Sequence, residues 1–176
     1  MRRTKYSAAV ALFVPCMLMG VCDVSAGGRG LGISSPAFAP SGSIPQVYTC
    51  DGKDISPELV IRDVPRKAKS LVLIVEDPDA PAGVWTHWLL WNIRPGADTI
   101  KQGTTPTGAV DGTNDFGEPG YGGPCPPWGT HRYFFKLYAL DAVLHISRGS
   151  RKPVLERAMK GHVIAHAELI GRYTRK

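Results

Sequence analysis

Two acids and two histidines stand where apolar runs of the sequence begin or end. Asp77 and Asp79 lie in EDPDAP (76–81), directly after an apolar run, while His87 and His131 open two aromatic-rich runs. Imidazole and carboxylate groups can transfer protons, hold a metal ion or hydrogen-bond an anion. Sites of this kind are usually built at the ends of rigid strands. We therefore expect the four side chains to share one site.

Each of these residues, taken alone, also has a purely structural interpretation. An aspartate in a proline-containing turn is typical of an Asx turn, which satisfies backbone N–H groups. His87 is expected on an apolar strand face, where a histidine is usually structural. That face consists of Trp85, Leu89 and Trp91. His131 could likewise be a core histidine that bonds to backbone, so the site rests on the four residues together.

The segment that leads into His131 is unusually stiff. GYGGPCPPWGT precedes the run HRYFFKLYAL, and proline fixes φ and reduces the entropy lost on ordering. In a strand, side chains alternate between faces, so His131 and Tyr133 point the same way, roughly 6–7 Å apart, and Arg132 points to the opposite face. The stiff loop and this polar pair can form one wall of a pocket.

The elements that must position these residues are mostly strands. The apolar and aromatic runs predict strands over 70–77, 85–93 and 131–140, joined by Pro- and Gly-rich loops that no helix tolerates. One helix is expected near the end of the chain, with Ser150 as N-cap, Pro153 in its first turn and Gly161 as its stop. A last strand follows in VIAHAELIGRY. One face of that strand is expected to hold Val163, Ala165, Ala167 and Leu169.

Composition indicates one globular domain. The chain has 176 residues, of which 43% are hydrophobic, with 20 Gly and 15 Pro, as expected for a turn-rich fold. The formal net charge is +6, which favours anionic partners only weakly. The basic clusters lack interleaved aromatic residues, so we interpret them as solvated surface and expect no nucleic-acid partner. These clusters are Arg66, Lys67 and Lys69, and Arg148, Arg151 and Lys152.

Residues 1–26 have the pattern of a signal peptide. Three basic residues precede the apolar stretch SAAVALFVPCMLMGV, and Val24-Ser25-Ala26 supplies small residues for cleavage. A membrane-spanning helix is the rival interpretation, but the stretch is interrupted by Pro15 and is shorter than the roughly 20 residues that a bilayer requires. We predict a periplasmic or secreted protein with a flexible segment over 27–33 and one domain over 34–176. A lipid anchor on Cys22 is a weaker alternative.

Two cysteines remain after such cleavage, Cys50 in YTCDG and Cys125 in GPCPP. In an oxidising compartment this pair could form a disulfide. Two buried thiols are the alternative, because the sequence does not reveal the distance between them. A zinc site needs more ligands at closer spacing.

The motifs VEDPDAP, WTHWLLWNI and GYGGPCPPWGTHRYFFKLYAL, in this order, resemble the phosphatidylethanolamine-binding protein family, also called Raf kinase inhibitor-like proteins, in its bacterial and archaeal branch. The resemblance extends from about Ser34 through AELIGRY. It implies a mainly β fold, an antiparallel β-sandwich, with a small pocket for phosphate-like anions or phospholipid headgroups. The residues it assigns to the pocket are Asp77, His87, Gly123, Pro124, His131 and Tyr133, with Asp79 beside them. We expect no cofactor.

Three classes of function remain open at this point. A binding protein for a phosphate-containing ligand is preferred, and the two imidazoles and the loop N–H groups are the expected donors. An inhibitor of a protease or kinase, by analogy with other family members, is the second class. A metal-dependent hydrolase is the third. The sequence has no HExxH, GxSxG or Walker motif that would support catalysis.

Overall fold

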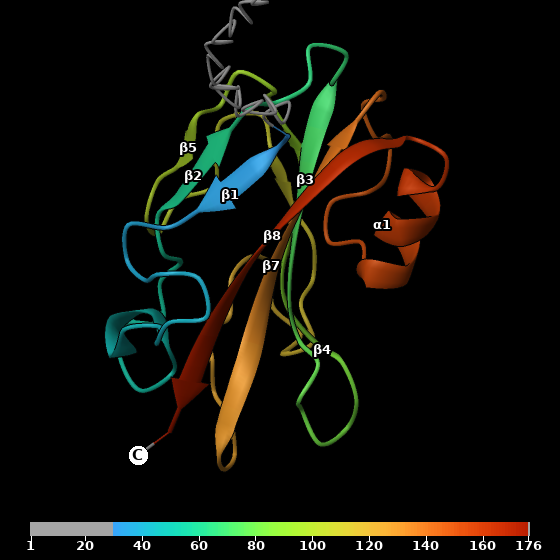
Figure 1. Ribbon diagram of the computed structural model, residues 1–176. Coiled ribbons are helices and arrows are strands. Elements are labelled where there is room, and N and C mark those ends of the chain that lie inside the picture. The colour runs from blue at the N-terminus through green and yellow to red at the C-terminus, as the bar shows by residue number, and fades with distance from the viewer. Residues whose placement is uncertain (1–29, 176) are drawn as a thin grey trace, which may run out of the picture.

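The computed structural model describes residues 30–175, so the predicted signal peptide and Cys22 lie outside the described residues. The elements follow each other in the order β1 (Gly32–Ser34), the 3-10 turn η1 (Gln46–Tyr48), β2 (Leu59–Arg62), β3 (Ser70–Asp77), β4 (Trp85–Ile93), β5 (Thr99–Ile100), β6 (Val110–Asp111), β7 (Thr130–Leu140), α1 (Lys152–Met159) and β8 (Val163–Thr174). Figure 1 shows the strands in two layers, with α1 beside the larger one.

The strands form two antiparallel sheets, and the predicted mainly β sandwich with one short helix is confirmed. The smaller sheet has the order β1-β2-β5, and the larger has the order β6-β4-β3-β7-β8. The central strand β3 is buried over its whole length, as its continuous run of β-branched and aliphatic residues requires. Strands β3 and β4 have the bounds that the sequence predicts, and β7 begins one residue earlier. The short strands β1, β2, β5 and β6 were not predicted.

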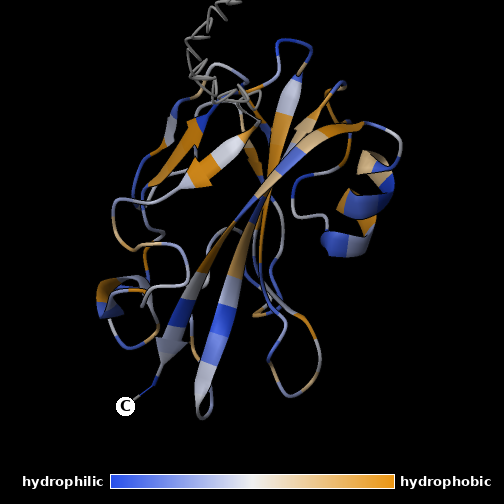
Figure 2. Ribbon diagram, in the orientation of Figure 1, coloured by the Kyte–Doolittle hydropathy of each residue, from blue (hydrophilic) through white to orange (hydrophobic). Residues whose placement is uncertain are grey.

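Hydrophobic residues pack on both faces of the larger sheet. One cluster fills the space between the two sheets and includes Leu73, Trp88 and Phe135. A second cluster lies under α1 and includes Leu89, Trp91 and Leu155. Figure 2 shows the hydrophobic residues concentrated on the strands, whereas the loops are mostly hydrophilic. Because both faces are covered, the ends of the central strands are held rigidly.

A β-bulge in β4 changes which way His87 points. Val75 pairs with Trp88 but Glu76 pairs with Thr86, so His87 is the extra residue between them. A bulge breaks the alternation of side chains. His87 therefore lies on the face that holds Tyr133, where the two ring centroids are 5.1 Å apart. The prediction that His87 shares a face with Leu89 and Trp91 is wrong, because those two residues pack under α1.

Two further expectations need correction at the ends of elements. Arg151 rather than Ser150 is the N-cap of α1, and the Ser150 hydroxyl donates to the carbonyl of Ser147 instead. Val163 is exposed, because a register irregularity separates it from the rest of β8. At the start of the described chain, Leu31 is buried and β1 begins at Gly32.

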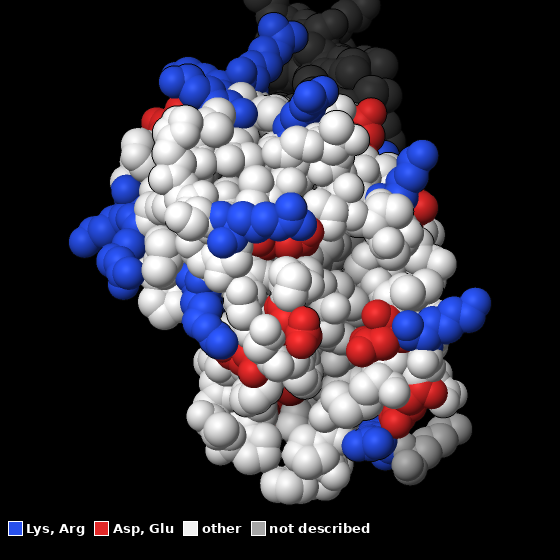
Figure 3. All heavy atoms as spheres, turned by 180° about the vertical axis from the view of Figure 1, so that it is seen from behind, with Lys and Arg blue, Asp and Glu red and all other residues white. Residues whose placement is uncertain are grey.

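No helix within residues 30–175 is long and apolar enough to cross a membrane. On the face drawn in Figure 3, Lys and Arg side chains are interspersed with Asp and Glu side chains. The charge of this face is therefore mixed.

Candidate anion-binding site

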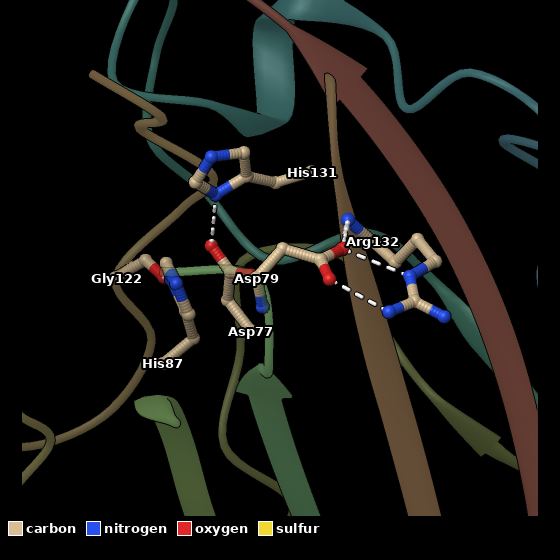
Figure 4. Close-up of polar contacts among 6 residues, drawn as sticks. All are labelled: Asp77, Asp79, His87, Gly122, His131 and Arg132. Carbon is tan, nitrogen blue, oxygen red and sulfur yellow. Dashed lines mark hydrogen bonds and ion pairs between the residues drawn. The ribbon is translucent and has the colours of Figure 1, made fainter. Parts of the chain in front are cut away.

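Asp77 and His131 form a buried pair where β3 ends and β7 begins. His131 Nδ1 lies 2.7 Å from Asp77 Oδ2, and both side chains are almost fully buried. Asp77 Oδ1 also accepts a hydrogen bond from the backbone N–H of Asp79, so the aspartate closes an Asx turn as well. The carboxylate thus fixes the imidazole ring, which leaves Nε2 of His131 for other partners. Figure 4 shows the two side chains pointing toward each other.

His87 is held from the glycine-rich loop. Its Nδ1 lies 2.7 Å from the carbonyl oxygen of Gly122, and its ring packs edge-on against Phe116 and Tyr133. Burial lowers the pKa of His87, and this effect outweighs the Gly122 carbonyl and the charge of Asp77. His87 is therefore a neutral imidazole at neutral pH.

A cavity of about 290 Å³ brings these residues together. Its polar lining comes from Asp77, His87 and His131, and the rest is mainly apolar. The apolar lining consists of Ala80, Pro81, Ala82, Trp85, Phe116, Cys125 and Pro127. The volume is at the lower end for ligand pockets, which favours a small ligand or a single headgroup. In such apolar surroundings each hydrogen bond is stronger than in water.

Asp79 lies outside this cavity. Its carboxylate accepts hydrogen bonds from the backbone N–H, Nε and Nη2 of Arg132, at 2.6–2.9 Å. These hydrogen bonds lower the pKa of Asp79 to about 2. Arg132 is on the opposite face of β7 from His131 (Figure 4). The ion pair of Asp79 with Arg132 therefore fixes the β3–β4 loop to β7 on the side away from the cavity. The structure thus places Asp77 in the cavity wall and Asp79 outside the cavity, so the two aspartates do not share one site.

Gly123 and Pro124 also do not line the cavity formed by the described residues. The N–H of Gly123 donates to Asp54 Oδ1, and the carbonyl of Pro124 accepts from Cys50. A Cβ at Gly123 would lie 2.5 Å from the carbonyl oxygen of Tyr48, so the position requires glycine for close packing. The N–H of Gly122 donates to the carbonyl of His87. The N–H groups of Gly122 and Gly123 are thus already used, contrary to their expected role as anion donors.

Tyr133 lies behind His87 rather than on the cavity surface. Its side chain is buried, and within residues 30–175 its hydroxyl has no hydrogen-bond partner. Burial and the negative charge of Asp77 raise the pKa of Tyr133 well above its usual value, so the phenol stays protonated. Tyr133 therefore supports the ring of His87.

A disulfide joins Cys50 to Cys125, across 75 residues of sequence, and resolves the two alternatives that the sequence left open. It ties the loop after η1 to the glycine-rich loop. Because Cys125 lines the cavity, the bridge fixes one wall.

The sequence did not predict three groups that belong to the site, namely Phe116, Pro127 and the carbonyl of Gly122. They lie in loops without periodicity, where the only available signal was the density of Gly and Pro. Among residues 30–175, no group of three or more His, Cys, Asp or Glu side chains is placed to hold a metal ion. In the cavity, the imidazole of His131 can donate a hydrogen bond to an anionic oxygen. The imidazole of His87 can accept a hydrogen bond.

The fold and this cavity define a class of protein, a two-sheet β-sandwich with a small pocket at the strand ends that is mainly apolar and holds three polar side chains. The profile of the family described as phosphatidylethanolamine-binding protein matches residues 34–174. The chain belongs to the phosphatidylethanolamine-binding protein family, as the motifs predicted.

Similar proteins come from both archaea and bacteria. A UPF0098 protein of Methanothermobacter thermautotrophicus is 51% identical over 150 residues, which cover 82% of this chain and 99% of the relative. A solved structure from Chlamydia trachomatis, described as a homologue of the family, has a TM-score of 0.81 and 47% identity, and the match covers 84% of this chain and 99% of that one. YbcL of Escherichia coli, described as a new member of the mammalian family, has a TM-score of 0.78 and 32% identity, with 84% and 100% covered.

Proposed function

We propose that this protein is a non-catalytic binding protein whose cavity holds a small phosphate-containing ligand, either a phosphate-like anion or a phospholipid headgroup. The observation that carries the proposal is the Asp77–His131 pair in the cavity wall. Asp77 accepts a hydrogen bond from Nδ1 of the ring, so Nε2 is the atom that donates to an anion when the ring is doubly protonated. A hydrogen bond from a charged imidazole to an anionic oxygen is about twice as strong as one between neutral groups.

The surroundings of the cavity suit a phosphate that carries an organic part. Phe116 lines the cavity and is 47% exposed. Val84 and Trp128 are each next in sequence to a lining residue and are 51% and 67% exposed. Tryptophan is enriched where proteins meet the membrane interface. These side chains support a lipid as the source of the phosphate. A comparison of binding to phospholipid vesicles with binding to free phosphate tests this.

His131→Ala should weaken the binding of inorganic phosphate and of phosphoethanolamine. Loss of a charge-assisted hydrogen bond should cost about 1.5–3 kcal/mol, or roughly 10- to 150-fold in Kd. Isothermal titration calorimetry measures the effect, and circular dichroism checks that the variant is folded.

His166→Ala is the matched control. His166 is an exposed residue of β8 that pairs with Tyr138, seven residues from His131 along β7 and so roughly 23 Å away. Its removal should leave Kd unchanged. If wild-type protein binds neither phosphate nor phosphoethanolamine, or if His131→Ala binds both as tightly as wild type, the proposal is wrong.

Inhibition of a protease or kinase, and export to the periplasm or medium, stay predictions. The disulfide supports export, because such bonds persist in oxidising compartments.

A further inference from the structure

The two histidines of the cavity offer opposite hydrogen-bonding groups. A carbonyl oxygen can only accept, so the 2.7 Å contact with Gly122 means that Nδ1 of His87 carries the proton. In a neutral ring Nε2 then holds a lone pair. Nε2 is not part of that hydrogen bond, and His87 lines the cavity. The ring nitrogen that remains for a ligand is therefore an acceptor.

His87 has little means of becoming a donor. Its ring is enclosed by Phe116 and Tyr133, and burial lowers its pKa. The carboxylate of the site is directed to the other histidine, since Asp77 Oδ2 contacts His131 at 2.7 Å. His87 therefore stays neutral and keeps the lone pair on Nε2.

A ligand without a proton to donate would be poorly matched to this cavity. When such a ligand displaces water from the cavity, the lone pair on Nε2 of His87 loses its hydrogen bond to water without replacement. If an anionic oxygen lay beside that lone pair, the two would also repel each other. Sites built to hydrogen-bond a particular group discriminate strongly against analogues that lack it.

We propose, on the basis of the anion-binding function above, that the cavity selects anions that carry their own hydrogen-bond donor. His131 donates to an anionic oxygen, and Nε2 of His87 accepts from the ligand. Two kinds of ligand share this chemistry. One is a phosphate or phosphate monoester that retains a proton, and the other is a phosphodiester with an ammonium group.

Matched pairs of ligands test the selection by titration calorimetry at pH 7. Phosphate keeps a proton at this pH and sulfate does not, although both are tetrahedral, so phosphate should bind at least about tenfold more tightly. Methyl 2-aminoethyl phosphate should likewise exceed ethyl methyl phosphate, from which only the ammonium is missing. The first pair tests the protonated phosphate and the second tests the zwitterionic headgroup.

His87→Phe and His131→Ala separate this inference from the proposed function. His87→Phe keeps a ring between Phe116 and Tyr133, and it should bring the phosphate-to-sulfate preference close to one. His131→Ala should weaken both anions. If phosphate and sulfate bind equally to wild type and His131→Ala weakens both, the proposed function stands and the selection is wrong. If wild type binds no ligand of either pair, both are wrong.

A measurement on wild-type protein tests the inference even if a variant does not fold. Nitrogen-15 NMR distinguishes a ring nitrogen with a lone pair from one that carries a proton. In the phosphate complex, Nε2 of His87 should retain its lone pair and its signal should shift on binding. A proton on Nε2 in that complex would overturn the inference.

Discussion

His87 and His131 show how partners decide what one residue type does. His131 contacts a carboxylate, whereas His87 contacts a backbone carbonyl and an aromatic ring and stays neutral. Asp77 and Asp79 differ in a similar way, since Asp77 is directed into the cavity and Asp79 to a surface arginine. Residue type alone does not separate these roles.

The neutral state of His87 should make the protein less stable in mild acid. The pKa of His87 is lowered in the folded chain, while in the unfolded chain it is about 6.5. Between these values the unfolded chain binds the proton and the folded chain does not. The free energy of unfolding should therefore fall as pH drops below about 6.5, by at most about 1.4 kcal/mol per pH unit from this group.

Urea titrations of wild type and His87→Phe at pH 7 and pH 5 provide the measurement. The variant lacks the titrating group, so it should lose less stability between the two pH values. An identical loss in both proteins would show that His87 is not the responsible group.

At the scale of elements, Glu76 joins three parts of the fold. It lies on β3, on the opposite face of the strand from Asp77, and it is paired with Lys136 of β7 and Lys152 of α1. Burial opposes ionisation of Glu76, but hydrogen bonds from both lysines outweigh it and lower the pKa. The helix is therefore fixed to the sheet by charge as well as by its apolar face.

Glu76→Gln should destabilise the protein by about 1–3 kcal/mol at pH 7, because it removes a charged acceptor from two lysines. Since the folded pKa is depressed, the wild-type contribution is present above the unfolded value near 4.5 and is lost as pH falls through the folded pKa. The difference between wild type and variant should thus shrink in acid. Thermal unfolding at pH 7 and pH 3 measures it.

Glu118→Gln is the control, because Glu118 is exposed, and its stability should match wild type within about 0.5 kcal/mol. A Glu76→Gln protein as stable as this control would contradict the bridging role.

At the scale of the whole molecule, the disulfide between Cys50 and Cys125 connects distant parts of the chain. It closes a long loop that contains β2 to β6. Replacing both cysteines with serine should cost about 2–4 kcal/mol, since the cross-link restricts the unfolded chain. Denaturant unfolding compares the double variant with wild type under non-reducing conditions. Equal stability would mean that the bond does not form in solution.

The central strands, and the placement of Asp77 and His131 at strand ends, could be predicted from the sequence. Strands β3 and β4 could be predicted to the residue because their apolar runs end at Pro- and Gly-rich loops, which are local signals. The alternation along β7 is also local, and it correctly separated His131 from Arg132. The motifs identified the family, and with it the sandwich.

The direction of His87, the contacts of Gly123 and Pro124, and the pairing of the cysteines depend on tertiary contacts that the sequence does not reveal. The bulge at His87 arises from the register between β3 and β4, which no period within β4 reveals. Gly123 is required by a contact with Tyr48, distant in sequence. The two-residue strands β5 and β6 are likewise defined by their partners. In each case the deciding interaction joins segments far apart in the chain, so it exists only once the sheets have formed.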